Sequence, residues 1–396
     1  MVSAYLKRFT VNSFIQNWCH VQVTIRGKLK MYNIGSLLTP IWDTRIVYRE
    51  TFAMLKDEGI CKASFLYRPD RILKIESYDG KSVYELGRDC YLDGSEIHIA
   101  PDTRINTMNC SHLCFNTREE ADAAMETQDN KFECSPVMMN DGKYLNLGAI
   151  GKPTFITDHQ IAITYRTTDT WNGYIPSNQI ENLITYKKKI ENKEKINIVL
   201  YGDSICCGFD KGSMYDLDPH QPIWPKALID GLRDSYAYDN DEDVQLINVS
   251  ESGMDSDWAY DNVEDRVFGH NPDLVILGFG MNDSVEGPEY AKKTLKIIDK
   301  IRDRFPRCEF VLISTSLPNP EVHTPPYFFD RYQDQYSDAL KSITSRGIVL
   351  ADVQSVHKEI LKHKRYIDIT GNLLNHPNDF ISAVYAQVLY ETLRLN

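Results

Sequence analysis

The chain has 396 residues, of which 42% are hydrophobic and 25% are charged, and its formal net charge is −12 at pH 7. This length predicts two or three domains, and the acidic balance argues against a nucleic-acid-binding protein, because such a protein needs a basic face. The negative charge also disfavours an anionic membrane surface as a partner. No run of residues approaches the ~18 apolar residues that a membrane-spanning helix requires.

The nine cysteines are irregularly spaced and odd in number, and they include the adjacent pair Cys206 and Cys207. This usage favours reduced thiols over a disulfide framework. Cys110 and Cys114 have no matching Cys/His pair at zinc-site spacing, so we expect neither a metal nor another cofactor. The first twenty residues lack the apolar core and cleavage site of a secretion leader. We therefore expect a cytoplasmic protein.

Residues 1–185 predict a mainly β domain of the sandwich or jelly-roll-like kind. Short apolar and aromatic runs alternate with turns, and Asp-Gly occurs at residues 79–80, 93–94 and 141–142. Asp-Gly between strand-like runs is a strong hairpin signal, and many short strands favour a sandwich or a small barrel. One helix is expected at residues 117–127. The expected strands are residues 20–25, 45–55, 63–67, 72–77, 82–86, 96–100 and 159–167.

The lysine-rich residues 186–195 predict a linker or connecting helix that leads into a second domain at residues 196–396. From residue 196 onward, strand-like and helix-like stretches alternate. Such alternation predicts a mainly parallel sheet covered by helices. The expected strands are residues 196–201, 244–249, 274–279, 310–314 and 348–352, and the expected helices are residues 223–236, 290–305, 328–346 and 379–395.

The first of these strands ends abruptly in Gly-Asp-Ser, which makes Ser204 a candidate nucleophile. A residue just beyond a buried parallel strand lies at the carboxyl edge of the sheet, where α/β folds bind ligands. The alternative is an ordinary strand-to-helix turn, because Asp and Ser both cap helices well.

Three further residues occupy the loops in which this α/β reading places a site: Gly253, Asn282 and His376. Acyl transfer needs a nucleophile, a nearby base and donors directed at the developing oxyanion. We assign Ser204 as nucleophile and His376 as its base. The oxyanion donors are the backbone N–H groups of Ser204 and Gly253 and the side chain of Asn282. Each residue taken alone also has a structural interpretation, but the combination favours catalysis.

This order of motifs resembles the SGNH hydrolase superfamily, also called the GDSL esterases and lipases, over residues 196–396. The resemblance implies a flavodoxin-like three-layer α/β/α domain and metal-free Ser-His ester hydrolysis. Most of the superfamily has an Asp three residues before the catalytic His, where this chain has Leu373. Asp368 or Asp379 then becomes the candidate acid that orients His376, and the alternative is a Ser-His dyad held by a backbone carbonyl.

A β domain joined to an SGNH domain also resembles bacterial carbohydrate acetylesterases. This layout implies removal of O-acetyl groups from plant-derived manno- or xylo-oligosaccharides. Trp224, Trp258 and the aromatic residues 327–329 are candidates for sugar stacking, with the proline-containing residues 317–327 as a wall. The alternatives are a lysophospholipase or thioesterase and a noncatalytic carbohydrate-binding protein on an esterase scaffold. This two-domain layout is also compatible with a homodimer.

Overall fold

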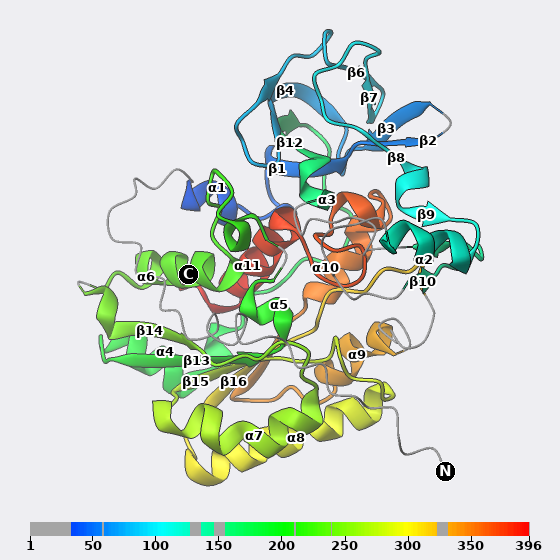
Figure 1. The fold of residues 1–396 in the computed structure, drawn as a ribbon. Coiled ribbons are helices and arrows are strands. Elements are labelled where there is room, and N and C mark those ends of the chain that lie inside the picture. Colours follow the sequence, from blue (N-terminus) through cyan, green and yellow to red (C-terminus); the bar gives the residue numbers. More distant parts are fainter. Residues whose placement is uncertain are drawn as a thin grey trace, which may run out of the picture.

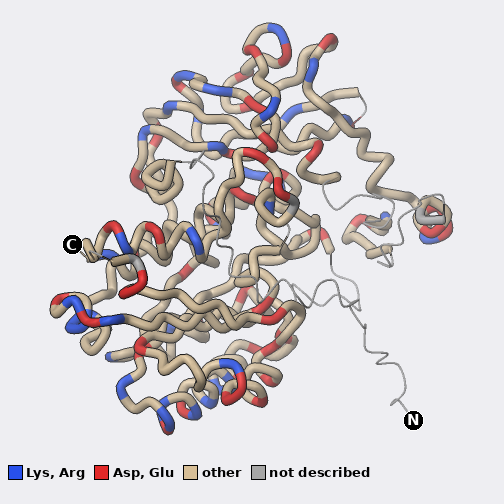
Figure 2. Tube along the Cα trace, turned by 60° about the vertical axis from the view of Figure 1, so that its left-hand side comes forward, with Lys and Arg blue, Asp and Glu red and all other residues tan. Residues whose placement is uncertain are grey.

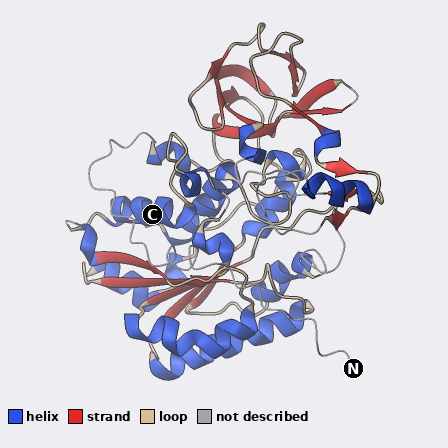
Figure 3. Cartoon of the chain, in the orientation of Figure 1, coloured by secondary structure: helices blue, strands red, loops and turns tan. Residues whose placement is uncertain are grey.

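The computed structural model describes residues 33–57, 59–126, 136–145, 155–209, 211–238, 240–322 and 332–395. It contains a mainly β part and a mixed α/β part, which stand one above the other in Figures 1 and 3. The expected class, a mixed α/β protein with β strands towards its N-terminus, is confirmed. The expected strand at residues 20–25 lies outside the described residues.

A five-stranded sheet forms the centre of the α/β part, and every pairing in it is parallel. Its strand order is β14-β13-β15-β16-β17. Strand β13, the first of these five along the chain, therefore has neighbours on both sides. The apolar runs explain this arrangement, because parallel strands are buried on both faces. The strands are β13 (Ile196–Gly202), β14 (Val244–Asn248), β15 (Leu274–Gly278), β16 (Glu309–Ile313) and β17 (Ile348–Ala351).

Helices cover both faces of this sheet, with α7 and α8 on one face and α6 and α11 on the other (Figure 1). The sequence predicted α6, α8 and α11 but not α7 or α10. The helices are α4 (Ile184–Glu191), α5 (Ser204–Cys207), α6 (Trp224–Tyr236), α7 (Ser256–Val267), α8 (Gly287–Arg304), α9 (Tyr336–Lys341), α10 (Val353–Ile360) and α11 (Asp379–Leu393).

The helix expected at residues 328–346 is much shorter than predicted, because α9 ends at Lys341. The hydroxyl groups of Ser342 and Thr344 donate to backbone carbonyls three residues earlier. Such side-chain bonds compete with helix continuation, which explains the early end. Residues 323–331 lie outside the described part of the chain.

The described residues of the β part form three sheets. A four-stranded antiparallel sheet has the order β1-β12-β4-β5, a five-stranded sheet has the order β6-β7-β3-β2-β8, and a small sheet has the order β10-β11-β9. The Asp-Gly pair at residues 93–94 closes the β6–β7 hairpin, where Gly94 has φ +62°. The strands are β1 (Ile46–Ala53), β2 (Leu55–Asp57), β3 (Ile60–Ser64), β4 (Pro69–Ser77), β5 (Val83–Tyr84), β6 (Cys90–Asp93), β7 (Glu96–Ile99), β8 (Met108–Asn109), β9 (Cys114–Phe115), β10 (Val137–Met138), β11 (Tyr144–Leu145) and β12 (Gln160–Thr167).

Two short helices, α2 and α3, accompany these strands, and a third, α1, lies elsewhere. Helix α2 (Arg118–Glu126) agrees with the predicted helix, and α3 (Phe155–Asp158) was not predicted. Helix α1 (Ile34–Leu38) packs against α6 and α11 of the α/β part, although the chain runs from it directly into β1. The other helical segments among the described residues are 3₁₀ turns at Cys110–His112, Ile180–Asn182, Gly212–Tyr215, Asp241–Asp243, Phe268–His270, Gln333–Gln335 and Tyr366–Asp368.

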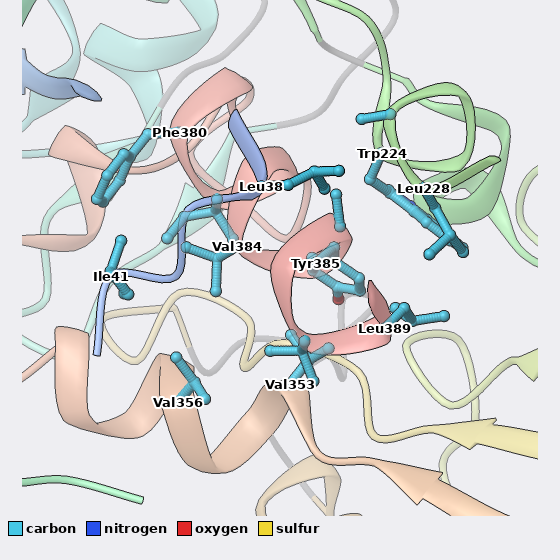
Figure 4. Packing of buried hydrophobic residues seen from close by; sticks show 14 of the residues in the cluster. Leu38, Ile41, Trp224, Leu228, Val353, Val356, Phe380, Val384, Tyr385 and Leu389 are labelled. Atoms are coloured by element: carbon cyan, nitrogen blue, oxygen red, sulfur yellow. The ribbon is translucent and has the colours of Figure 1, made fainter. Parts of the chain in front are cut away.

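Gln387 of α11 holds the segment of residues 37–41 that follows the start of α1. The side-chain NH₂ group of Gln387 donates to the carbonyl of Leu37 at 2.8 Å, and its side-chain oxygen accepts from the N–H of Ile41 at 3.1 Å. Figure 4 shows Ile41 beside Phe380 and other apolar side chains of the same core. One hydrophobic cluster therefore runs from this segment through both parts of the molecule. The domain boundaries predicted from the sequence stay a prediction.

Acidic and basic positions are interspersed along the described part of the trace (Figure 2). Within the described residues, no helix has both the length and the apolar character needed to cross a membrane.

A buried ion pair joins the β part to the segment that follows α10. The Nζ of Lys364 lies 2.7 Å from the carboxylate of Glu50, and both side chains are 0% exposed. The same carboxylate accepts from the hydroxyl of Tyr165 and from the N–H of Leu66, and Lys364 also donates to the carbonyl of Ser64. A buried pair tolerates its loss of hydration only when further hydrogen bonds satisfy it, as these do.

We predict that Lys364→Ala lowers the free energy of unfolding by about 3–5 kcal/mol, because Glu50 is left as an uncompensated buried charge. Urea denaturation measures the effect. The matched control is Lys62→Ala, which breaks an ion pair with Glu96 in which the lysine is 47% exposed. That change is expected to cost at most about 1 kcal/mol. Equal losses in the two variants would contradict the prediction.

Candidate active site

The turn after β13 carries Ser204 at the carboxyl edge of the parallel sheet. Asp203 caps helix α5, and its Oδ1 accepts from the N–H of Ile205 at 2.9 Å. Ser204 is therefore the first residue of a helix, with its backbone N–H at the helix N-terminus. Such N–H groups have no partner within the helix and are free to bind a negative charge.

Two glycines allow this turn to lie close to the sheet. A Cβ atom added to Gly202 or to Gly278 would lie 2.4 Å from the Sγ atom of Cys206, which real contacts do not permit. The two glycines are paired across β13 and β15. Sequence analysis assigned neither glycine a role, because their closeness depends on strand pairing that the sequence does not show.

The structure brings the two predicted catalytic side chains together. The Oγ of Ser204 lies 2.8 Å from the Nε2 of His376, although the residues are 172 positions apart in the chain. Ser204 is only 3% exposed, and His376 is half-buried. A base within hydrogen-bond reach of a serine hydroxyl has the geometry for accepting its proton.

The three predicted oxyanion donors lie on loops after neighbouring strands. No hydrogen bond between described residues uses the backbone N–H of Ser204 or of Gly253. Gly253 has φ +77° and no atom within 4 Å of the place where a Cβ would stand. The amide of Asn282 donates to the carbonyl of Met254 at 3.1 Å, which holds it beside the Gly253 loop. An amide NH₂ group has two N–H bonds, so one stays available for a ligand.

The Asn282 loop is supported from behind by buried side chains. The carboxylate of Asp283 accepts from both the N–H and the hydroxyl of Ser256. The amide of Gln333 donates to the carbonyls of Met281 at 3.1 Å and Asp283 at 2.9 Å. Asp283 therefore has a structural role, because its carboxylate and carbonyl join the Asn282 loop to Ser256 and Gln333. The role of Gln333 could not be predicted, because it acts across about fifty residues of sequence.

Burial raises the pKa of both carboxyl groups behind the site. The pKa of Asp203 rises to about 7, chiefly by desolvation, and the pKa of Asp283 rises to about 6 for the same reason. Burial penalises the charged form of a carboxylic acid. Near neutral pH, Asp203 is therefore protonated in a large share of molecules, which lowers the cost of burying it.

The backbone around His376 forms a closed loop of hydrogen bonds. Its N–H donates to the side-chain oxygen of Asn372 at 3.0 Å. Its carbonyl accepts from the hydroxyl of Thr370 at 2.9 Å and from the N–H of Gly371 at 3.0 Å. These contacts fix the backbone from which the imidazole projects.

The expectation that Asp368 or Asp379 contacts His376 is wrong. Asp368 forms an ion pair with Arg365 at 2.8 Å and accepts from the N–H of Ala53. The carboxylate of Asp379 accepts from the N–H of Gly212 at 3.0 Å, and burial raises its pKa. No hydrogen bond or ion pair joins either of these two described carboxylates to His376. Both acids hold other parts of the chain together instead.

Leu373 stands three residues before His376, where most of the superfamily has an Asp, and its side chain packs among apolar residues. Its side chain is 3% exposed and belongs to an apolar cluster with Met108, Leu113 and Val137 of the β part. Its backbone has φ +64°, and its carbonyl accepts from the amide of Asn319 at 2.7 Å. The leucine therefore anchors the loop to the β part.

Asn378 connects the β part to the loop that carries His376. Its side-chain oxygen caps α11, and its amide donates to Thr51 at 2.9 Å and to Gln160 at 3.1 Å. The amide of Gln160 donates in turn to the carbonyls of Ile367 and Thr370. Strands β1 and β12 thus hold both ends of the loop. The sequence signal was limited to an Asn that precedes an expected helix.

The proposed sugar-stacking residues do not all reach the site. Trp224 is 0% exposed, its indole N–H donates to the carbonyl of Ile205 at 3.0 Å, and its ring stacks on Tyr385. Its assignment to substrate binding is therefore wrong, because it belongs to the core (Figure 4). Trp258 is half-buried at the start of α7, with its ring 6.0 Å from that of Tyr201. Residues 327–329 lie outside the described residues.

The α/β part of the chain is similar to known proteins. Residues 200–381 match the model of the GDSL-like Lipase/Acylhydrolase family. A curated arylesterase from Vibrio mimicus is 26% identical over 144 residues, and the match covers 36% of this chain and 62% of that protein. The motif order and the family match define an acylhydrolase domain of the GDSL/SGNH type. The chain covers less than two thirds of the length of this arylesterase.

Two esterases are among the solved structures to which this chain is similar. A two-domain esterase active on acetylated mannans is 17% identical, with a TM-score of 0.42 over 55% of this chain and 53% of that one. The acetylxylan esterase Axe2 from Geobacillus stearothermophilus is 19% identical, with a TM-score of 0.40 over 50% of this chain and 93% of that one.

We predict that Gln160→Ala lowers kcat for a small aryl acetate by about 10- to 100-fold, because the histidine loop loses its hold on β12. Steady-state kinetics and thermal unfolding measure the effect and separate it from global loss of structure. The control is Gln179→Ala, which removes a similar bond to the carbonyl of Leu350 far from this loop. An unchanged kcat in a folded Gln160→Ala variant would show that the bonds of Gln160 to the histidine loop do not matter for activity.

Restoring the family's acid at position 373 is expected to fail. Leu373→Asp places a carboxylate in an apolar cluster, so it lowers the free energy of unfolding by at least about 2 kcal/mol and does not raise kcat. Leu373→Met keeps the volume and is expected to cost less than about 1.5 kcal/mol. Chemical denaturation and ester hydrolysis measure both effects, and faster hydrolysis by Leu373→Asp would contradict the prediction.

Proposed function

We propose that the protein is a serine esterase that removes O-acetyl groups from carbohydrate, with manno- and xylo-oligosaccharides as the substrate class. The observation that carries the ester chemistry is the 2.8 Å contact between Ser204 Oγ and His376 Nε2, beside two backbone N–H groups without a partner among described residues. A nucleophile, a base and oxyanion donors at one sheet edge are the parts that acyl transfer needs.

In this proposal His376 accepts the hydroxyl proton of Ser204 as the oxygen attacks the acetyl carbonyl carbon. The oxyanion is stabilised by the N–H groups of Ser204 and Gly253 and by the amide of Asn282. When the ester C–O bond breaks, His376 returns the proton to the departing sugar oxygen. Water then attacks the acetyl-enzyme with His376 as base, and acetate leaves as Ser204 regains its proton.

Small polar residues next to the oxyanion donors support a hydroxyl-bearing substrate over a lipid chain. Ser252 adjoins Gly253 and is half-exposed, and Ser284 follows the Asn282 loop and is exposed. Trp258 is half-buried at the start of the helix after Gly253 and stays the candidate for sugar contact. The hydrogen bonds between the β part and the histidine loop support a role for that part in the active site.

We also propose the finer architecture implied by the family resemblance. The parallel strand order β14-β13-β15-β16-β17 supports a flavodoxin-like three-layer catalytic domain at residues 196–396, because that fold has the order 2-1-3-4-5. The antiparallel sheets before it support a sandwich-like accessory domain over residues 1–185. Helix α4, which spans most of residues 186–195, supports a connecting helix in place of a flexible linker.

We predict that Ser204→Ala lowers kcat for p-nitrophenyl acetate by about 10⁴-fold or more, because the nucleophile is lost while the oxyanion donors remain. Ser342→Ala, at the exposed end of α9, is the matched control and keeps full activity. Turnover retained by Ser204→Ala would overturn the assignment.

The substrate is tested by acetate release from acetylated manno- and xylo-oligosaccharides beside esters of longer acids. Preference for long acyl chains would support the lysophospholipase or thioesterase alternative. Failure of a fluorophosphonate probe to label Ser204, together with sugar binding, would support the noncatalytic alternative.

A further inference from the structure

A cavity of about 610 Å³ lies where the β part meets the C-terminal end of α10. Its walls are the loop between β3 and β4, the turn between β6 and β7, residues 168–172 and the helix that carries Glu359. Ser204, Gly253, Asn282 and His376 do not line it, so it is separate from the catalytic site. Its volume is in the range that small-molecule sites occupy.

Trp171 supplies a fixed aromatic surface in this cavity. Its indole N–H donates to the carbonyl of Tyr174 at 2.9 Å, and its ring makes an edge contact with Tyr67 at 6.4 Å between centroids. The ring is half-buried and packs partly against the main hydrophobic core. A planar ring held at its edge is suited to stack on the apolar C–H face of a sugar ring.

The remaining walls are rich in hydrogen-bonding groups of both kinds. Asp169 and Glu359 offer acceptors, and Arg68, Asn172 and the neighbouring hydroxyl groups offer donors. The two carboxylates are already engaged, Asp169 with the N–H of Arg68 and Glu359 with Lys362. Mixed donors and acceptors without an excess of positive charge favour a neutral, hydroxyl-bearing ligand over an anion such as phosphate.

The floor of the cavity is rigid. The loop that carries Phe65 and Leu66 is tied to the buried pair of Glu50 and Lys364, through the N–H of Leu66 at 2.9 Å and the carbonyl of Ser64 at 2.8 Å. Phe65 packs edge-on against Tyr165 at 4.9 Å. A site formed before its ligand arrives avoids part of the ordering cost of binding.

We propose that this cavity is a second, noncatalytic carbohydrate-binding site, which holds a neutral oligosaccharide by stacking on Trp171 and by hydrogen bonds to its polar walls. The proposed site takes no part in ester hydrolysis, and its ligand needs no acetyl group. It therefore stands or fails independently of the proposed function.

Calorimetric titration of the full chain with unacetylated mannopentaose and with unacetylated xylopentaose tests the proposal. At least one of them is expected to bind, and Trp171→Ala is expected to weaken that binding at least about 10-fold, because the stacking surface is lost. Trp171→Phe keeps an aromatic face and is expected to stay within about threefold of the unsubstituted chain. Hydrolysis of p-nitrophenyl acetate is measured in parallel and is expected to be unchanged by either substitution.

Asn172→Arg offers a second variant that spares the core, because it fills the cavity from an exposed position. It is expected to weaken binding like Trp171→Ala. The matched control is Tyr260→Ala, which removes a 40% exposed aromatic ring from α7. Absence of binding at millimolar oligosaccharide overturns the proposal. Binding that survives both Trp171→Ala and Asn172→Arg overturns it as well, since the sugar then occupies another site. Binding with the expected losses supports it even if the chain hydrolyses no ester.

Discussion

The hydrogen bonds of Asn378 fix one end of the loop that carries His376, whose Nε2 lies 2.8 Å from the Oγ of Ser204. One side chain caps α11 with its oxygen and bonds to β1 and β12 with its amide. His376 lies two residues earlier, so these bonds restrain the backbone from which the imidazole projects. Because a short misplacement of a catalytic group is costly in rate, the proposed esterase mechanism makes this contact of the β part matter for activity.

The same dependence appears in the packing of the molecule. The core cluster that contains Phe52 and Tyr165 of the β part also contains Ile198 and Leu200 of the parallel sheet. The buried pair of Glu50 and Lys364 bridges the two parts at another point. Since the charges are satisfied only when both parts are in place, the β part and the α/β part support each other.

Elements with strong local patterns could be predicted from the sequence. The five parallel strands appear within about two residues of the expected limits, because each is a short apolar run that ends in turn residues. Helix α7 was not predicted, because polar and charged residues occupy most of its positions and obscure the apolar pattern. The position of Ser204 directly after β13 could be predicted because Gly-Asp-Ser follows such a run.

The sequence by itself determined which residues stand at the ends of the parallel strands, and therefore which side chains meet near Ser204. It could not determine the roles of Asp368, Asp379 and Trp224, because a carboxylate or an indole bonds to whatever the fold brings near it. The tertiary structure placed Asp368 on Arg365 and Trp224 in the core. It also decided that Gln160, more than two hundred residues away, supports the histidine loop. Contacts at such separations depend on how strands and helices pack, and local sequence patterns carry no record of that.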